Sequence, residues 1–556
     1  MVTEAHRDYN LQLSARTQSM NDTGTLNYLW SQAMIAGFVA AGVGDAVISP
    51  GSRSTPLALA ILRQPSLRCE IAVDERCAAF FGLGIAKATR RPVLLLATSG
   101  TAPANWLPAV VEAGHAGVPL ILISADRPPE LQNCGANQTI NQLGLFGSQV
   151  RASHALGAPE PGFDPGYLHR LAAQVCEQAS WPYPGPVHLN QPFREPLLPT
   201  EPTPAITIPA KISAPPPTLH PDAATIRDLA QRISGRPGFI VCGEMPGRPG
   251  QNAALAALAA RLRCPILAEP LSGLRFGPHD RTNISVRYQD WLTDPAFSGQ
   301  CKSEWILRFG GYPVTRKLQN FVAGIDGTQA LADPWPRWSD PAHRLTHLLR
   351  AEPAAVCQAL LAANPAPAPD GWLAMCMGLE KVADNPSKPS HVRTLIDELP
   401  DGAGLFVGNS LAIRQLDTDS GSAEKALHIH ANRGASGIDG NISTAAGIAS
   451  NYRRTVALLG DLTCQHDLGG LALAQGRDLV IVVVNNGGGG IFDHLPQRQL
   501  PEFTAGWRTP QQIDFSHAAS AFGIFYARAE SNEALRTTLR AALAAGGPHL
   551  IELIVP

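Results

Sequence analysis

The sequence has almost no net charge, few charged residues and no long apolar run. Its 556 residues include 44 Lys and Arg against 46 Asp and Glu, a net charge of -2, and charged residues make up only 16% of the chain. A nucleic-acid-binding protein usually carries a basic face, so we expect no nucleic-acid partner. The longest apolar runs, such as Leu479–Val484, are far shorter than the roughly 20 residues that cross a bilayer, so we expect no membrane span.

Cysteine is present without the spacing of a metal site. The ten cysteines are scattered, and no two of them form a Cys-x-x-Cys pair. No cluster of His and Cys has the spacing of zinc ligands. The N-terminus lacks the pattern of a signal peptide, so we expect a cytoplasmic protein with reduced thiols.

What the sequence does have is apolar bulk, glycine and proline. Apolar residues make up 45% of the chain, which is enough to bury large cores, and there are 51 Gly and 48 Pro. Two Pro-rich stretches, Pro199–Pro221 and Asn364–Pro369, are typical of stiff connectors. They predict three domains, at residues 1–200, 201–365 and 366–556.

Short apolar runs without polar alternation recur in all three blocks. Such runs are typical of strands covered on both faces, as in parallel sheets. The Ala- and Leu-rich segments Cys77–Thr89 and Ala253–Leu262 predict crossover helices. The predicted fold is three α/β domains with mostly parallel sheets, the middle one Rossmann-like. The predicted strands are Ala46–Ser49, Pro92–Thr98, Val118–Ser124, Gly238–Cys242, Pro265–Ala268, Trp305–Phe309, Gly404–Val407, Thr455–Leu459 and Leu479–Val484.

An internal repeat relates the first and third blocks. Gly84–Ala86 and Val93 recur as Gly447–Ala449 and Val456, at a constant offset of 363. Each copy follows a strand that ends in a Gly-containing turn and precedes a second buried strand. The repeat predicts that the first and third domains are homologous and share one topology.

A possible magnesium and diphosphate site lies in the third block. Asp461 follows one buried strand, and Asn486 and Gly488 follow the next one along the chain. In an open α/β sheet, ligands sit just outside the carboxyl ends of the strands. A carboxylate, an amide oxygen and a loop carbonyl there form the oxygen site that Mg²⁺ prefers, and glycines let the backbone approach a diphosphate. An Asp cap followed by a flexible glycine loop remains the alternative.

This spacing resembles the motif of thiamine diphosphate enzymes, with Leu462 where a Gly is usual. That resemblance implies a pyrimidine-binding first domain, a diphosphate-binding third domain, and Mg²⁺ or Mn²⁺ held by Asp461, Asn486 and Gly488. It also implies a catalytic glutamate that bonds the aminopyrimidine ring, for which Glu75 is the candidate. The repeat maps Glu75 onto Ile438, an apolar residue of the kind that holds the cofactor bent. The implied cofactor-binding residues are Glu75, Gly437, Ile438, Asp461, Leu462, Thr463, Asn486, Gly488, Ile491 and Phe492.

Further motifs narrow the resemblance to one family. Ser49–Leu57, Ser99–Ala102, Ala125–Leu131, Cys134–Gln138 and the segments Val407–Leu411 and Asn432–Gly440 are similar to motifs of the 2-succinyl-5-enolpyruvyl-6-hydroxy-3-cyclohexene-1-carboxylate synthases of menaquinone and phylloquinone biosynthesis. The family implies decarboxylation of 2-oxoglutarate and addition of the succinyl unit to isochorismate. It also implies a homodimer or homotetramer with active sites between chains.

Both of these substrates are polycarboxylates, which Arg forks recognise. By the resemblance, Ser410, Arg414 and Arg433 hold the succinyl carboxylate, and the catalytic residues are Glu75, Arg53, Gln138 and Arg414. A basic residue of the middle domain aligns with Arg316, with Lys317 beside it as the alternative. The residues implied to bind substrate are Ser52, Arg53, Arg127, Gln138, Arg316, Ser410, Arg414 and Arg433.

Two other functions are compatible with this scaffold. An acetolactate-synthase-like carboligase would bind a small methyl group and would not need this set of Arg residues. A catalytically inactive regulatory relative would be expected to have lost Glu75 or Asp461, and both are present. A flavin in the middle domain is an analogy only, because no Gly-x-Gly-x-x-Gly fingerprint occurs there.

Overall fold

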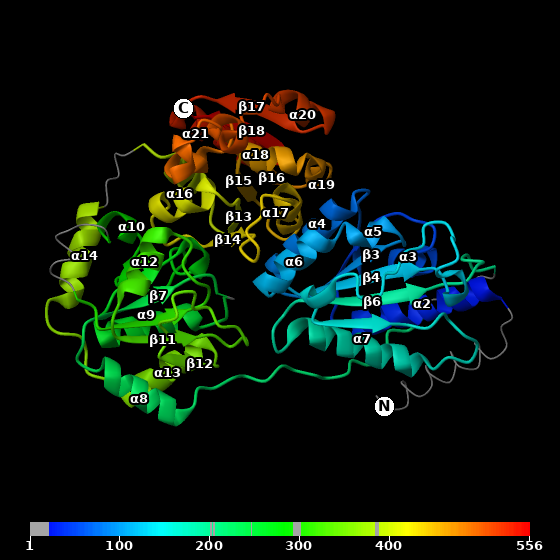
Figure 1. Cartoon of the computed structure of the whole chain (residues 1–556), viewed down its shortest axis with the longest axis horizontal. Helices are drawn as coiled ribbons and strands as arrows, with labels where there is room; N and C mark the ends of the chain where they lie inside the picture. The colour runs from blue at the N-terminus through cyan, green and yellow to red at the C-terminus, as the bar shows by residue number, and fades with distance from the viewer. Residues whose placement is uncertain are drawn as a thin grey trace.

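The computed structural model describes residues 22–200, 203, 206–245, 247–292, 302–383 and 389–555. They form three six-stranded sheets, and every strand pair described in them is parallel. In Figure 1 the first unit (blue to teal) and the middle unit (green) are joined by a long extended segment, and the third unit (yellow to red) lies above them. The predicted three-domain α/β fold with parallel sheets is confirmed. No helix of the described ranges is long and apolar enough to cross a membrane.

The first sheet has the strand order β2-β1-β3-β4-β6-β5. Helices α4 and α6 cover one face, and α2 and α7 cover the other. The strands are β1 (Asp45–Ile48), β2 (Arg68–Ile71), β3 (Val93–Ala97), β4 (Leu120–Asp126), β5 (Ala152–Ala155) and β6 (Pro186–Pro192). The helices are α2 (Thr23–Ala40), α3 (Thr55–Leu62), α4 (Glu75–Thr89), α5 (Thr101–Ala104), α6 (Leu107–Ala116) and α7 (Pro165–Ser180), with 3₁₀ turns η1 (Pro129–Leu131) and η2 (Gly147–Gln149).

The third sheet repeats this order strand for strand, as β14-β13-β15-β16-β18-β17. Its strands are β13 (Ala403–Val407), β14 (Leu427–Ala431), β15 (Thr455–Gly460), β16 (Leu479–Asn485), β17 (Phe525–Ala529) and β18 (His549–Ile554). Its helices are α15 (His391–Glu398), α16 (Leu411–Asp419), α17 (Asn441–Ala449), α18 (Asp461–His466), α19 (Leu471–Ala474), α20 (Phe515–Ala521) and α21 (Asn532–Ala545). Short turns are η4 (Leu468–Gly470), η5 (Gly490–His494), η6 (Pro496–Gln499) and the π-turn η7 (Thr504–Arg508). The structure therefore supports the homology that the repeat predicted.

The middle sheet has a different order, β12-β11-β10-β7-β8-β9. With β7 numbered as strand 1 and the sheet read from its β9 edge, the order is 3-2-1-4-5-6, which is that of the Rossmann fold. The strands are β7 (Gly238–Cys242), β8 (Ile266–Ala268), β9 (Ile284–Ser285), β10 (Trp305–Phe309), β11 (Thr328–Ala332) and β12 (His347–Leu349). The helices are α8 (Ala223–Ile233), α9 (Gln251–Leu262), α10 (Tyr288–Trp291), α12 (Arg316–Gly324), α13 (Pro353–Ala363) and α14 (Trp372–Ala383), with the turn η3 (Pro270–Ser272).

Helices α4 and α17 join the first and third domains in one continuous core. They pack at repeat-related glycines. A Cβ on Gly84 would lie 2.1 Å from the carbonyl oxygen of Thr444, and a Cβ on Gly447 would lie 2.1 Å from that of Phe81. The two helices therefore approach backbone to backbone at equivalent positions, which only glycine permits.

Helix α14 packs on the middle sheet, although residues 366–556 were expected to form the third domain. Trp372 and Cys376 are buried against Phe239 and Val241 of β7. The Trp372 indole N–H donates to the carbonyl oxygen of Gly238 at 3.1 Å. We therefore propose that the middle domain extends through α14 and does not end at residue 365.

Candidate active site

The candidate site residues gather at the carboxyl ends of the strands in the first and third sheets. Thr98 and Asp461 directly follow β3 and β15, which are equivalent strands. Arg127 and Asn486 directly follow β4 and β16. Since parallel strands end at one edge, each domain presents a single functional edge.

Asp461 is tied to the glycine loop that follows β16. Its carboxylate accepts the backbone N–H of Leu462 at 2.8 Å and that of Gly488 at 2.7 Å. The side chain is buried, and burial raises the pKa of Asp461 above its usual range. Gly488 has a φ of +128°, and a Cβ there would lie 2.3 Å from the carbonyl oxygen of Arg508. The loop is thus folded tightly over the carboxylate.

The oxygen atoms at this point fit a divalent cation. Within the described ranges, no group of three His, Cys, Asp or Glu could hold a metal. One carboxylate with amide and carbonyl oxygens is nevertheless the donor set that Mg²⁺ shares with a phosphate. The Arg508 guanidinium lies beside these oxygens, with Nη1 3.4 Å from Asn486 Oδ1. A positive group therefore already sits against the proposed ligands.

The other expected cofactor residues flank this loop. Leu462 and Thr463 form the first turn of α18 after Asp461. Ile491 and Phe492 lie in η5, directly after the glycines. All four therefore adjoin the proposed metal site.

Glu75 begins helix α4 and is half-buried. The preceding Asp74 caps the helix by accepting the Cys77 N–H at 3.1 Å. Across the domain boundary, the start of α4 contacts Asp467 through Cys77, whose thiol donates to the Asp467 carboxylate at 3.6 Å; the same carboxylate accepts the Ser443 N–H at 2.8 Å. Asp467 follows the end of α18, whereas Asp461 begins it. Within one chain, the start of α4 therefore meets the far end of the helix that carries Asp461.

The loop at 432–440 is held by residues from two domains. Asn409 donates to the carbonyl oxygens of Asn432 at 2.9 Å and Gly437 at 2.6 Å. Glu112 of α6 accepts the backbone N–H groups of Gly434 at 2.9 Å and Ala435 at 2.7 Å. This loop carries Arg433 and presents Ile438, which is 37% exposed. Neither Asn409 nor Glu112 was among the expected site residues, because each acts through contacts with a distant segment.

The first arginine pair, Arg53 and Arg127, lies in the first domain. Arg53 is buried and donates to the carbonyl oxygen of Phe193 at 3.0 Å and to Glu195 at 2.7 Å. Burial and then the Arg53 charge lower the pKa of Arg127. Arg127 also donates to the Ser99 hydroxyl.

Gln138 lies beside this pair, and its side-chain amide donates to the carbonyl oxygen of Ser99 at 2.9 Å. Ser52 precedes Arg53 and is exposed. The structure thus places Ser52, Arg53, Arg127 and Gln138 in one region of the first domain. Ser99 contacts both Arg127 and Gln138, although the sequence indicated it only as part of the motif Ser99–Ala102.

The second pair, Arg414 and Arg433, lies in the third domain. Burial and then the Arg433 charge lower the pKa of Arg414. Arg414 donates to the carbonyl oxygen of Ser410 at 2.5 Å, and Arg433 donates to Asn409 Oδ1 at 2.5 Å. Ser410 itself has a φ of +63°, an uncommon conformation for a residue with a side chain. Two guanidinium groups held close in this way favour an anion between them.

The middle-domain cation lies at the start of α12. Arg316 and Lys317 are both exposed, but the Lys317 ammonium donates to the carbonyl oxygen of Gln289 at 2.8 Å. Lys317 is therefore engaged within its own domain. This contact favours Arg316 over Lys317 as the residue that reaches a substrate.

A cavity of about 940 Å³ lies where the three domains meet. Its wall includes Lys87 from the first domain, Glu244 from the middle domain and Arg433 from the third. Burial raises the pKa of Glu244. Arg433 and Gly434, on the loop that Glu112 and Asn409 hold, line this cavity.

Family models of known proteins match the first and third domains. Residues 30–145 match the N-terminal TPP binding domain of thiamine pyrophosphate enzymes, and residues 419–553 match their C-terminal TPP binding domain. A benzoylformate decarboxylase from Polynucleobacter necessarius has the same fold, with a TM-score of 0.70, 19% sequence identity and coverage of 95% of this chain and 98% of its own. Fold and site together define a thiamine diphosphate-dependent enzyme, as the sequence predicted.

Curated relatives then give the family. A 2-succinyl-5-enolpyruvyl-6-hydroxy-3-cyclohexene-1-carboxylate synthase from Dechloromonas aromatica is 69% identical over 534 residues, which cover 96% of this chain and 99% of the relative. The synthase of Bacillus velezensis is 38% identical and covers 93% of each chain. The chain belongs to this synthase family. The predicted family is confirmed, and an acetolactate-synthase-like enzyme is not favoured.

Proposed function

We propose that the protein decarboxylates 2-oxoglutarate and adds the resulting succinyl unit to isochorismate, the step of menaquinone biosynthesis that its family name describes. The observation that carries this assignment is the presence of two separate arginine pairs at two equivalent sheet edges. Arg53 with Arg127 and Arg414 with Arg433 each concentrate positive charge where a carboxylate fits. Two carboxylate substrates account for both pairs.

The residues present fit thiamine diphosphate and a divalent metal. Asp461, Asn486 and Gly488 would hold Mg²⁺ or Mn²⁺, and the glycine loop would receive the diphosphate. Thiamine diphosphate supplies the reactive carbon and the electron sink that decarboxylation of a 2-oxo acid needs. Glu75 would hold and exchange a proton with the aminopyrimidine ring through its carboxylate. Ile438 would support the middle of the cofactor.

The two arginine pairs would orient the two substrates. Arg414, Arg433 and Ser410 would bind the distal carboxylate of 2-oxoglutarate, since all three lie at the edge that carries the metal site. The donors that would face isochorismate are Ser52, Arg53, Arg127 and Gln138 of the first domain, with Arg316 of the middle domain.

One assay tests this function directly. The purified protein is incubated with 2-oxoglutarate and isochorismate, with and without thiamine diphosphate and Mg²⁺, and the product and CO₂ are quantified by mass spectrometry. We expect product only with both cofactors. Replacing 2-oxoglutarate by pyruvate is the control for an acetolactate-synthase-like activity. Turnover of pyruvate but not 2-oxoglutarate would reject the proposal.

We further propose that the active site forms between two chains of a homodimer or homotetramer. Within one chain the start of α4 contacts Asp467, through Arg76 at 4.0 Å and Cys77 at 3.6 Å, so the metal edge that faces Glu75 would come from a partner. Val73 is 83% exposed and Ile71 47% exposed beside Glu75, as expected for a surface that a partner covers.

Mixing two inactive variants tests the shared site. Glu75→Gln and Asp461→Ala proteins are combined after reversible dissociation. Random exchange makes half the dimers mixed, and one site of each mixed dimer collects neither lesion, so about one quarter of all sites recover. Subunit exchange is shown independently by mass spectrometry. Exchange without any recovered activity would mean that each site is built within one chain.

A further inference from the structure

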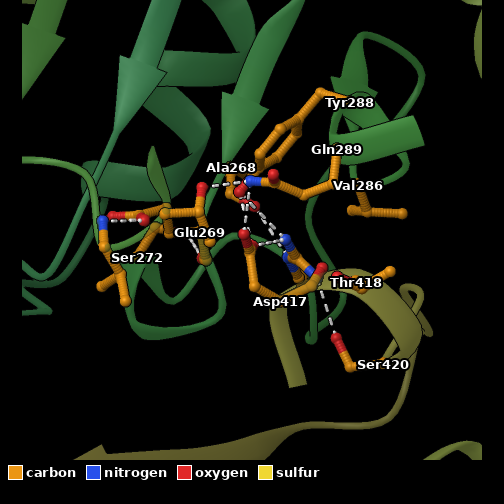
Figure 2. Close-up of polar contacts among 12 residues, drawn as sticks. Ala268, Glu269, Ser272, Val286, Tyr288, Gln289, Asp417, Thr418 and Ser420 are labelled. Atoms are coloured by element: carbon orange, nitrogen blue, oxygen red, sulfur yellow. Dashed lines mark hydrogen bonds and ion pairs between the residues drawn. The ribbon is translucent and has the colours of Figure 1, made fainter. Parts of the chain in front are cut away.

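A buried polar network joins the middle domain to helix α16 of the third domain. Figure 2 shows Asp417 reaching from the third-domain ribbon to Tyr288 and Gln289 of the middle domain. Asp417 Oδ1 accepts the Arg275 guanidinium at 2.5 Å and the Tyr288 hydroxyl at 2.5 Å. Asp417 Oδ2 accepts the Gln289 amide at 2.7 Å. Arg275, Tyr288 and Asp417 are each 1% exposed or less.

The same network holds the carboxyl-terminal end of α16. Arg275 donates to the carbonyl oxygen of Asp417 at 2.7 Å and to the Ser420 hydroxyl at 2.9 Å. Arg287 donates to the carbonyl oxygen of Thr418 at 2.6 Å. The last carbonyls of a helix lack intrahelical partners and carry partial negative charge, so two arginines there are well matched to them. The middle domain thus holds the carboxyl-terminal end of α16 by hydrogen bonds.

The opposite end of α16 carries residues that we propose bind 2-oxoglutarate. Ser410 precedes the helix and Arg414 lies in its first turn, three residues before Asp417. Residues three apart share one side of a helix, so Arg414 and Asp417 are coupled through less than one turn of backbone. The helix has only nine residues, so fixing its end also fixes where Arg414 points.

The network also reaches the start of α12. The Gln289 side-chain amide donates to the Thr315 hydroxyl as well as to Asp417, and the Gln289 carbonyl accepts from Lys317. Thr315 is the residue directly before Arg316. One glutamine therefore contacts both the helix that carries Arg316 and the helix that carries Arg414.

We propose that Asp417 is a positioning residue, through which the middle domain sets the place of Arg414 for 2-oxoglutarate. This inference rests on the proposed role of Arg414. On this proposal the middle domain has a function in the reaction: it holds helix α16, which carries Arg414, at a defined distance from Arg316. A purely structural bond between domains would stabilise the fold without favouring either substrate.

The test separates these two roles by measuring KM for each substrate. Asp417→Asn keeps the shape of the side chain and removes the charge that pairs with Arg275. We expect KM for 2-oxoglutarate to rise at least about tenfold, with KM for isochorismate changed less than about twofold, as for loss of one hydrogen bond to a charged group. Equal changes in both KM values, or a lower Tm with neither KM changed, would overturn the proposal.

The matched control is Asp333→Asn. Asp333 is also 1% exposed and pairs with Arg337 at 2.6 Å, but this pair lies within the middle domain, on the loop after β11. We expect a lower Tm and unchanged KM values for both substrates. A rise of KM for 2-oxoglutarate in Asp333→Asn equal to that in Asp417→Asn would show a general effect of destabilisation and reject positioning.

A gentler variant keeps the test valid if Asp417→Asn does not fold. Tyr288→Phe removes one hydroxyl that donates to Asp417 and leaves the ion pair intact. We expect KM for 2-oxoglutarate to rise about two- to fivefold, as for loss of one hydrogen bond, and no change would overturn the proposal. Arg414→Ala is run in parallel. If Arg414→Ala leaves KM for 2-oxoglutarate unchanged, the assignment of Arg414 fails; if only Asp417→Asn and Tyr288→Phe leave it unchanged, positioning alone fails.

Discussion

The first and third domains share one sheet order but carry different chemistry at equivalent strand ends. Thr98 follows β3 where Asp461 follows β15, and Arg127 follows β4 where Asn486 follows β16. One edge therefore carries an arginine, which we propose binds a substrate, and the other carries the oxygen atoms proposed to hold a metal. The shared scaffold therefore fixes the positions of these residues, and the residue type at each strand end decides the chemistry.

The equivalent helices begin at different points. Helix α4 starts at Glu75, whereas α17 starts only at Asn441, the counterpart of residue 78 in the repeat. Gly440, with a φ of +62°, takes the residue before α17 out of the helical conformation, and a Cβ there would lie 1.9 Å from the ring of Phe80. The first domain thus offers a carboxylate at a helix start, and the third domain offers a loop that displays Ile438.

The comparison predicts its largest effects at Glu75 and Asp461. Glu75→Gln should lower turnover by about 100- to 10,000-fold, the range for loss of a proton-transfer group, while cofactor affinity stays near normal. Asp461→Ala should weaken thiamine diphosphate binding by roughly 100-fold, because it removes the carboxylate that we propose holds the metal. Turnover and calorimetric cofactor binding measure the two effects. Near-normal turnover of Glu75→Gln would place the proton-transfer group elsewhere.

The two arginine pairs should separate the two substrates. Arg414→Ala should raise KM for 2-oxoglutarate, and Arg53→Ala should raise KM for isochorismate. Each loses a charge-assisted contact with a carboxylate, which costs roughly 1.5–3 kcal/mol. Steady-state kinetics with each substrate varied in turn measures the split. If both variants affect both substrates alike, the division of the pocket is wrong.

Replacing either glycine at the contact between α4 and α17 should destabilise the protein to a similar extent. Gly84→Ala and Gly447→Ala each place a methyl group against a backbone oxygen, and each should lower the free energy of unfolding by about 1–3 kcal/mol. Chemical denaturation measures both variants. Gly378→Ala in α14, where a Cβ meets no neighbour within 4 Å, is the matched control. A large effect at only one of the two glycines would break the symmetry of the comparison.

The smallest effect concerns Glu269, which directly follows strand β8 of the middle domain. Glu269 accepts the Val314 N–H at 2.7 Å, and burial together with the Asp417 charge raises its pKa to about 8. The folded state therefore holds this proton more tightly than the unfolded state. The stabilisation from it is present below pH 4.5 and is lost as the pH rises through about 8.

The corresponding variant is Glu269→Gln, which cannot titrate. It should lose part of the decline in unfolding free energy between pH 5 and pH 8.5, measured by urea denaturation at both values. Glu304→Gln, an exposed glutamate paired with Arg236, is the control and should keep the decline. A decline of equal size in Glu269→Gln and the natural protein would assign the pH dependence to other groups.

Much of the fold could be predicted because buried parallel strands are uniformly apolar. The nine predicted strands lie within two residues of observed ones, and Gly238–Cys242 and Trp305–Phe309 agree at both ends. The strands that were missed include the edge strands, such as β2 and β5, which are partly exposed. Strand β6 was also missed, because His188 and Asn190 make its sequence look polar. Both side chains are buried in the fold, where each forms a hydrogen bond of 2.8 Å with the Ser124 hydroxyl.

The strand cores, the repeat and the family could be predicted, because short segments contain the local composition and motif spacing on which they depend. Which distant residues hold the site together becomes visible only in the folded chain. Glu112 reaches a loop 322 residues away, and Arg275 reaches Asp417 across 142 residues. Such pairs leave no pattern in a single sequence, since each partner is an ordinary polar residue until folding removes both from water and makes their contact necessary.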